Sequence, residues 1–317
     1  MVQTGSLPAS AAASVGQPLV SVIVPSFNHA RYLRECIDSV LAQDHPSLEL
    51  IVVDDGSTDG SLELLKSYGE RLRLLQQQGG RQARARNLAL AVARGELVAF
   101  LDSDDRYRPG RISAAVAAFR AQPQAALVWA DYTFIDAEGR PCGEMRWASP
   151  GGDFRRVLIA GNPICNATAT VRRAVLDEIG GFDERVPRVC DGAAWTQIAA
   201  RGHAFVHLPQ VVLDYRLHGD NDSARFAPMT HDRDTALLAA AQAYVQRGVV
   251  AGPADLAWLR GVLLRQFAFR AAAWVQRELS QGRASEWRAR GYEALGSDAG
   301  LQAFARLRAA KRWAGAR

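Results

Sequence analysis

The stretch Leu97-Val98-Ala99-Phe100-Leu101-Asp102-Ser103-Asp104-Asp105 decides the fold class of this chain. Its first five residues are all apolar, without the polar alternation of a half-exposed strand. A continuous apolar run of this length is typical of a strand that is buried on both faces of a parallel sheet. We therefore predict a strand over Leu97–Leu101 that ends directly at three carboxylates.

Three similar apolar runs precede this one: Leu19–Val24, Leu48–Val53 and Leu72–Leu75. Helical patterns separate the runs, one with Tyr32, Cys36, Val40 and Leu41 on its apolar face, the others over Gly60–Tyr68 and Gln82–Arg94. A helix from Pro109 to about Gln122 and a flanking strand over Ala126–Ile135 follow. This order predicts an α/β fold, with a mostly parallel sheet covered by helices on both faces.

The 317 residues divide by their pattern into three parts. Residues 1–17 are rich in Ala, Ser and Gly, and we predict a flexible leader. Residues 18–231 carry the strands and helices of the sheet domain. Residues 232–317 are almost wholly helical in pattern, which predicts an α-helical C-terminal extension. With 48% hydrophobic and 22% charged residues, the composition excludes a mainly disordered chain.

The positive charge of the chain is concentrated in the predicted extension. The formal net charge is +5, and the segment from Asp232 to Arg317 holds 14 basic and 7 acidic side chains. Three roles stay open for this segment: a cover packed on the sheet domain, peripheral association with an anionic membrane, and contact within a homo-oligomer. Because no nucleic-acid-binding motif accompanies the charge, we predict no nucleic-acid partner.

The cysteines and the N-terminal sequence indicate a compartment. Four cysteines without CxxC spacing predict neither a disulfide framework nor a zinc site, which fits a reducing cytosol. No apolar run reaches the ~18–20 residues of a membrane helix, and the start lacks the basic and apolar regions of a signal peptide. We expect a cytoplasmic protein, either free or at the inner face of the cytoplasmic membrane.

Polar residues also follow the first two predicted strands, as Pro25-Ser26-Phe27-Asn28 and Asp54-Asp55-Gly56-Ser57-Thr58-Asp59. Ligands of open parallel sheets bind beyond the carboxyl ends of the strands. The carboxylates after the fourth strand repel one another unless a cation or hydrogen-bond donors compensate. Each motif alone is commonly a turn or a solvated loop. Together, at one sheet edge, they predict a site for Mg²⁺ or Mn²⁺ and a phosphorylated ligand.

The residues from Pro18 to Asn221 resemble the family 2 inverting glycosyltransferases, which have the GT-A fold. The motifs that carry the resemblance are Ser21-Val22-Ile23-Val24-Pro25-Ser26-Phe27-Asn28, Val53-Asp54-Asp55-Gly56-Ser57-Thr58-Asp59, Ala85-Arg86-Asn87, Phe100-Leu101-Asp102-Ser103-Asp104-Asp105, Gly180-Gly181-Phe182-Asp183-Glu184, Ala199-Ala200-Arg201-Gly202 and Tyr215-Arg216-Leu217-His218. The resemblance implies an enzyme that moves a sugar from a nucleotide-diphosphate sugar to a hydroxyl of a glycan or lipid-linked acceptor. UDP and dTDP are the donor nucleotides that we expect.

The resemblance also implies the roles of individual residues at the donor. It places Pro25, Phe27, Asn28 and Asp55 around the nucleobase, with Phe27 against the ring and Asp55 accepting from a base N–H or a ribose hydroxyl. It places Arg86 and Asn87 near the donor. Asp102 and Asp104 match the family's Asp-x-Asp motif, so that Asp104 is expected to bind Mn²⁺ or Mg²⁺ and Asp102 to face the ribose or the ion.

Three further positions keep two interpretations each. Asp191 falls at the family's general-base position, but its place before a predicted helix also fits an N-cap. His218 is a metal or diphosphate ligand by resemblance, or an ordinary loop residue. Arg216 pairs either with phosphate or with a structural carboxylate.

Two departures from the family pattern concern the acceptor and the donor loop. Cys190 stands directly before the expected base, where the family usually has Glu. Arg81 separates the glycine pair from the Ala-Arg-Asn triplet, either as a phosphate-facing side chain or as a solvated one. Two other functions compete with the glycosyltransferase: a nucleotidyltransferase and a degenerate nucleotide-sugar-binding protein.

Overall fold

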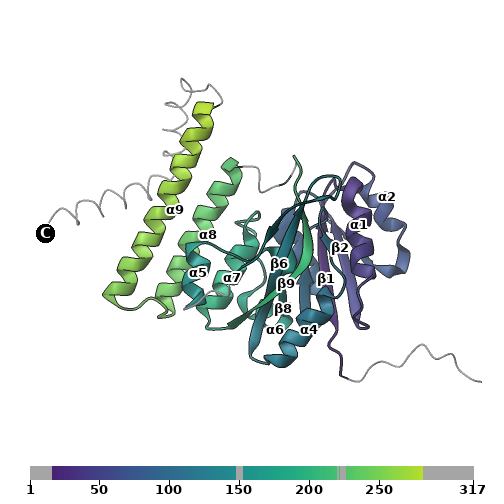
Figure 1. The fold of residues 1–317 in the computed structure, drawn as a ribbon, viewed down its shortest axis with the longest axis horizontal. Coiled ribbons are helices and arrows are strands. Elements are labelled where there is room, and N and C mark those ends of the chain that lie inside the picture. The colour runs from purple at the N-terminus through teal and green to yellow at the C-terminus, as the bar shows by residue number, and fades with distance from the viewer. Residues whose placement is uncertain (1–15, 148–152, 220, 222–225, 281–317) are drawn as a thin grey trace, which may run out of the picture. The chain divides into compact units, whose positions relative to one another are not determined.

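A computed structural model describes residues 16–147, 153–219, 221 and 226–280, and the side chains of 226–231 and 267–280 are left out of the description. The chain divides into two compact units, Met1–Asn221 and Asp222–Arg317 (Figure 1). Most of the predicted leader and residues 281–317 of the predicted extension therefore lie outside the described residues. The first unit contains the sheet.

The first unit alternates strands and helices from its start. Its elements are β1 (Val20–Ser26), α1 (Ala30–Leu41), β2 (Leu48–Asp54), α2 (Ser61–Lys66), β3 (Arg73–Gln76), α3 (Arg81–Val92), β4 (Leu97–Phe100), β5 (Arg106–Tyr107), α4 (Arg111–Ala121), β6 (Ala125–Ile135), β7 (Pro141–Met145), α5 (Phe154–Ala160), β8 (Thr170–Arg172), α6 (Arg173–Ile179), α7 (Cys190–Ala200) and β9 (Ala204–Arg216). The four strands predicted upstream of Asp102 and the three helices between them are all present. Where the predictions gave bounds, the ends differ from them by at most two residues, as is usual at frayed ends.

The sheet is parallel in its first half and mixed in its second. Its strand order is β3-β2-β1-β4-β8-β6-β9-β5, with β7 attached to β6. β1, β2, β3 and β4 pair in parallel, whereas β8 runs antiparallel to both β4 and β6. β9 is again parallel to β6 over most of its length. The predicted α/β fold of GT-A type is confirmed, and each antiparallel pair includes at least one strand that follows α4.

Two hydrophobic cores sandwich the sheet, because successive side chains of a strand point to opposite faces. In β1, Val22 and Val24 enter the core under α1, α2 and α4, whereas Ile23 enters the core under α3, α6 and α7. Leu33 of α1 and Trp195 of α7 are fully buried on these two faces. Burial on both faces explains why the strands read as unbroken apolar runs rather than as alternating ones.

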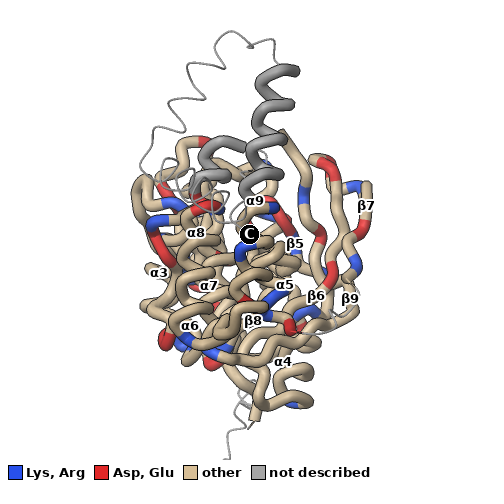
Figure 2. The backbone as a smooth tube through the Cα atoms, turned by 90° about the vertical axis from the view of Figure 1, so that its left-hand side faces the viewer, with Lys and Arg blue, Asp and Glu red and all other residues tan. Residues whose placement is uncertain are grey.

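The second unit contains the helices α8 (Phe226–Gln246) and α9 (Pro253–Ser280), which pack against each other. Its described core includes Tyr244, Leu259 and Val262. The unit boundary after Asn221 and the start of α8 both precede Asp232, where the pattern placed the boundary. Among the described helices of the chain, none combines the length and the apolar character needed to cross a membrane. Basic and acidic positions are interspersed over the described backbone of the first unit (Figure 2).

Candidate active site

The carboxyl ends of β1, β2 and β4 meet at one edge of the sheet. β1 lies between the other two strands, with Ser26 opposite Asp54 of β2 and Ile23 opposite Phe100 of β4. The loop that leaves β1, the loop that leaves β2 and the acidic loop that leaves β4 therefore begin side by side. This placement is where ligands of open α/β sheets bind.

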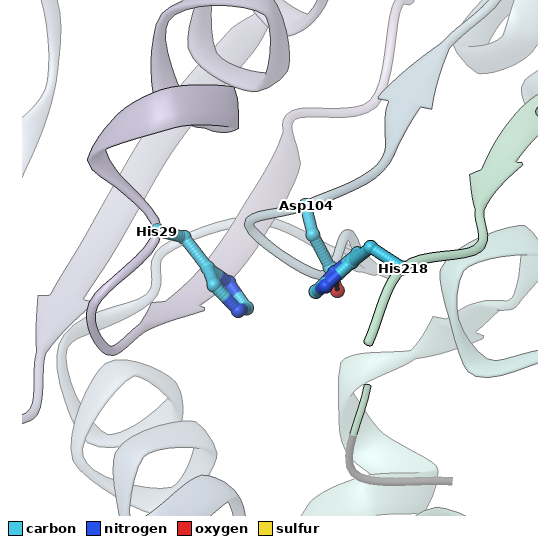
Figure 3. Close-up of side chains that lie close together, drawn as sticks. All are labelled: His29, Asp104 and His218. Atoms are coloured by element: carbon cyan, nitrogen blue, oxygen red, sulfur yellow. Dashed lines mark hydrogen bonds and ion pairs between the residues drawn. The ribbon is translucent and has the colours of Figure 1, made fainter. Parts of the chain in front are cut away.

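The acidic loop presents Asp104 to His218. Asp104 is buried, and its Oδ2 atom lies 2.9 Å from His218 Nε2 and 3.3 Å from Asn221 Nδ2. His29 approaches the same place from the start of α1 (Figure 3). One ligand atom from each of His29, Asp104 and His218 lies within 4.8 Å of the others. Two imidazoles and a carboxylate are a suitable donor set for a divalent transition-metal ion, so these residues fit the expected cation.

His29 is the residue of this cluster that the sequence reasoning missed. It directly follows Asn28, which the resemblance had already placed at the donor. That adjacency was the available signal, but a single histidine at the start of a helix carries little information by itself. Its partners Asp104 and His218 come from distant segments, so their convergence required the fold.

Asp102 lies beside Arg86 and is not one of the three clustered residues. The guanidinium of Arg86 is buried, with Nη2 3.0 Å from Asp102 Oδ1 and Nη1 3.0 Å from Cys190 Sγ. Burial, opposed by the charge of Arg86 and aided by the charges of Asp104 and Asp191, raises the pKa of Asp102 to about 6. A divalent cation next to these carboxylates would offset their repulsion, so the electrostatics also favour a cation here.

Cys190 supplies a neutral partner to the buried Arg86. Burial raises the pKa of the Cys190 thiol to about 11, with Asp191 adding to the shift and Arg86 opposing it. The thiol therefore stays protonated at neutral pH. At this position, where the family pattern has Glu, the chain carries no negative charge, and the carboxylate that pairs with Arg86 is Asp102.

Asp191 lies in the first turn of α7. The helix begins at Cys190 and its N-cap position is Val189, so the N-cap interpretation of Asp191 is wrong. The chain becomes helical earlier than the apolar pattern predicted, which moves Asp191 inside the helix. Among the described residues, none donates a hydrogen bond to its carboxylate. Asp191 is near enough to Asp102 and Arg86 to influence the pKa of both.

The loops that leave β1 and β2 are tied together through Asn28. Its backbone has φ 53°, a left-handed conformation that Asn tolerates better than most residues. Its Oδ1 accepts from the Thr58 N–H at 2.8 Å, and its own N–H donates to Ser57 Oγ at 3.0 Å. Next to it, the Phe27 ring is 54% exposed and available for contact. Pro25 is buried inside β1, which continues past it to Ser26.

Asp55 holds the loop that leads into α3. Its two carboxylate oxygens accept from the N–H groups of Gly80 and Arg81, at 2.8 and 2.7 Å. Arg81 begins α3 with φ 60°, and its side chain is exposed. Asp55 was expected to accept from a base or ribose, and the structure adds a structural role in which it fixes this loop.

Asn87 and Arg216 are held by protein groups. Asn87 Nδ2 donates to the Phe182 carbonyl and to Glu184 Oε1, both at 2.9 Å, and Asn87 Oδ1 accepts from the Phe182 N–H at 2.8 Å. Asn87 therefore anchors the Gly-Gly-Phe-Asp-Glu loop. Arg216 is buried and donates to Glu35 and to the Asp104 carbonyl, so of its two interpretations the structural carboxylate is the one present.

Comparison with known proteins agrees with this architecture. The family model described as Glycosyl transferase family 2 matches residues 21–180. TuaG of Bacillus subtilis, a glycosyltransferase ascribed to teichuronic acid biosynthesis, is 32% identical over 214 residues, which are 66% of this chain and 82% of TuaG. Other relatives are longer. The chain spans only 22% of the length of the chondroitin synthase of Pasteurella multocida and 21% of that of the hyaluronan synthase of Pasteurella multocida, each at 30% identity over 214 residues.

Two solved structures share the fold at low sequence identity. S. aureus TarS 1-349 in complex with UDP-GlcNAc superposes with a TM-score of 0.59 at 22% identity, covering 85% of this chain and 75% of that one. The mannosyltransferase PcManGT from Pyrobaculum calidifontis, in complex with GDP-Man and Mn²⁺, gives a TM-score of 0.56 at 23% identity, covering 92% and 87%.

The fold and the sheet-edge site thus define a glycosyltransferase of GT-A architecture. The chain belongs to glycosyl transferase family 2, as the family match and the sequence relatives show.

Proposed function

We propose that this enzyme is a metal-dependent inverting glycosyltransferase that uses a nucleotide-diphosphate sugar, with UDP or dTDP as the nucleotide. The acceptor is a hydroxyl of a glycan or of a lipid-linked glycan. The observation that carries the proposal is that Asp104 lies against His218 beyond the carboxyl end of the sheet, with Asp102 and Asp191 close enough to interact electrostatically. UDP-GlcNAc in TarS and teichuronic acid for TuaG support the donor and acceptor classes.

Asp104 and His218 would hold the divalent ion, Mn²⁺ or Mg²⁺. When bound, the ion supplies charge stabilisation to the diphosphate as the nucleotide leaves. Mn²⁺ in PcManGT supports this assignment. Asp102 is directed at Arg86 rather than at Asp104 and His218, so we assign it to the ribose side of the donor.

Asp191 would act as the general base. Inverting transfer requires a group that takes the proton of the acceptor hydroxyl as its oxygen attacks the anomeric carbon. The Asp191 carboxylate is half-buried and has no hydrogen-bond donor among the described residues, which leaves it available to a hydroxyl. Arg86 lies near enough to Asp191 for the two charges to interact.

Phe27, Asn28 and Asp55 would form the nucleobase and ribose side of the pocket. The exposed Phe27 ring can stack on a base, and the tied loops of Asn28 and Asp55 give it a fixed position. Pro25, Arg86 and Asn87 would support the donor pocket. Pro25 does so as part of β1, Arg86 through its ion pair with Asp102, and Asn87 through its hydrogen bond to the Phe182 loop.

A thermal-shift experiment tests the proposal. We expect UDP or dTDP to raise the melting temperature only when Mn²⁺ or Mg²⁺ is present, because the ion would hold the diphosphate. A ligand at 100 times its Kd stabilises the folded protein by about 2.7 kcal/mol, which is enough to measure. Asp104→Asn should remove the shift, whereas Asp191→Asn and the surface variant Asp177→Asn should keep it. The proposal fails if no nucleoside diphosphate stabilises the wild-type protein with either ion.

A further inference from the structure

His29 has no role in the proposed function, although it lies in the cluster with Asp104 and His218. Its ring lies against His218, with the ring centroids 5.7 Å apart and the planes at 90°. Its ligand atom lies within 4.8 Å of those of Asp104 and His218 (Figure 3). A histidine that served only to begin α1 would not need this position, because its side chain makes no capping hydrogen bond.

We propose that His29 is a third protein ligand of the divalent ion, together with Asp104 and His218. The inference rests on the proposed metal-dependent function and extends it, since it adds a residue from the β1–α1 loop to the ligand set. Three segments then meet at the ion: the end of β1, the acidic loop after β4 and the segment after β9.

Ser103 prepares the His29 ring for this role. His29 Nδ1 lies 2.7 Å from Ser103 Oγ, and Ser103 is buried. In the tautomer that carries hydrogen on Nδ1, this nitrogen donates to Ser103 and Nε2 keeps its lone pair for the ion. Such outer partners orient metal-bound histidines in many sites. Because Ser103 lies between Asp102 and Asp104, one loop supplies both a ligand and the support of a second ligand.

The backbone before His29 directs it toward the cluster. Asn28 adopts φ 53°, so the chain turns sharply between β1 and α1, and Ser57 and Thr58 hold this turn through hydrogen bonds to Asn28. A left-handed conformation at a residue other than glycine costs free energy and persists where its surroundings enforce it. The position of the His29 backbone is thus defined by the loop after β2 as well as by β1.

Two imidazole ligands change the expected preference among ions. Mg²⁺ is usually bound through oxygen atoms, and imidazole nitrogen favours transition-metal ions. A site with His29, His218 and Asp104 therefore selects Mn²⁺ over Mg²⁺ more strongly than one with a single histidine would. His29, Asp104 and His218 would hold the ion and leave it accessible to oxygen atoms of a diphosphate.

The test is a titration of the full-length protein with Mn²⁺ alone, with free Mn²⁺ measured by electron paramagnetic resonance. We expect His29→Gln to weaken Mn²⁺ binding by about tenfold or more and Ser103→Ala to weaken it by about tenfold, as loss of an outer partner does in other sites. His203→Gln is the matched control, because His203 bonds to Glu178 in another part of the first unit. Pulsed resonance should detect two imidazole nitrogens on Mn²⁺ in the wild type and one in His29→Gln.

The outcomes separate this inference from the proposed function. If His29→Gln binds Mn²⁺ as tightly as the wild type and keeps both nitrogen couplings, while Asp104→Asn loses binding, the His29 ligand is refuted and the metal site stands. If the wild type does not bind Mn²⁺, both proposals fail. The metal-free melting temperature of His29→Gln should match that of the wild type, which excludes misfolding as the cause.

Discussion

Arg216 donates from Nη2 to Glu35 Oε2 across 2.7 Å and so joins the last strand of the sheet to its first helix. The guanidinium is 1% exposed, whereas the Glu35 side chain is 52% exposed. Its other donors bind the carbonyl oxygens of Asp104, Asp136 and Ala137. Arg216 therefore makes one hydrogen bond to Glu35 and further hydrogen bonds to backbone carbonyls, which do not depend on Glu35.

The first prediction follows from this asymmetry. Arg216→Met should lower the free energy of unfolding by about 1–3 kcal/mol for each buried carbonyl that it leaves without a donor. Glu35→Gln should lower it by less than about 1 kcal/mol, because this partner is half exposed. Urea unfolding of both variants measures the difference, and equal losses would show that the ion pair itself dominates.

The second prediction concerns Asp191. Asp191→Asn should lower the turnover number about 10²–10⁴-fold, the usual contribution of a general base, and leave the donor affinity nearly unchanged. Turnover is measured as release of nucleoside diphosphate from a nucleotide-diphosphate sugar in the presence of a panel of glycan acceptors. The nucleotide is the one that stabilises the protein in the thermal-shift experiment. Asp177→Asn, on the exposed side of α6, is the control. Near-normal transfer by Asp191→Asn would remove Asp191 from the chemistry.

The third prediction concerns Phe27. Phe27→Ala should weaken nucleoside diphosphate binding by about 1–3 kcal/mol, the range for stacking of a base on an aromatic ring. Because the ring is 54% exposed, stability should change by less than about 0.5 kcal/mol. Calorimetric titration measures the affinity, and Leu256→Ala is a matched exposed apolar control. Unchanged affinity would place the base elsewhere.

The fourth prediction is a pH dependence at Glu49. Burial by itself would raise the pKa of Glu49, but hydrogen bonds from Ser21 and Arg94 outweigh it and lower the pKa below its usual range. A lowered folded-state pKa contributes stability above the unfolded pKa of about 4.3, and this contribution is lost as the pH falls through the folded pKa.

Glu49→Gln should therefore cost about 1–2 kcal/mol at pH 7, which is the usual effect of hydrogen bonds to a charged group reduced by solvent screening at the exposed Arg94. The difference from wild type should shrink as the pH falls below about 4. Urea unfolding over this pH range measures it. Glu63→Gln, an exposed change in α2, should have little effect at any pH. A constant difference at Glu49 would contradict a role for its charge.

Most of the parallel half of the fold was predictable from the sequence. The runs Leu48–Val53 and Leu97–Leu101 became β2 and β4 because burial on both faces leaves a local signature, an apolar residue at every position. The antiparallel strand β8 was harder to predict, because its three residues are too few to show a period. The boundary at Asp232 fell inside α8, since a helical pattern does not reveal which unit a helix belongs to.

The sequence by itself determined the α/β class, the family and the places where chemistry-bearing residues leave the strands, because these are carried by local runs and ordered motifs. The tertiary structure alone decided which side chains meet. Contacts between different elements show this: Arg86 binds Asp102 and Cys190, Arg216 binds Glu35, and His29 lies beside Asp104 and His218. Such contacts depend on strand order and helix placement, and no local pattern encodes them.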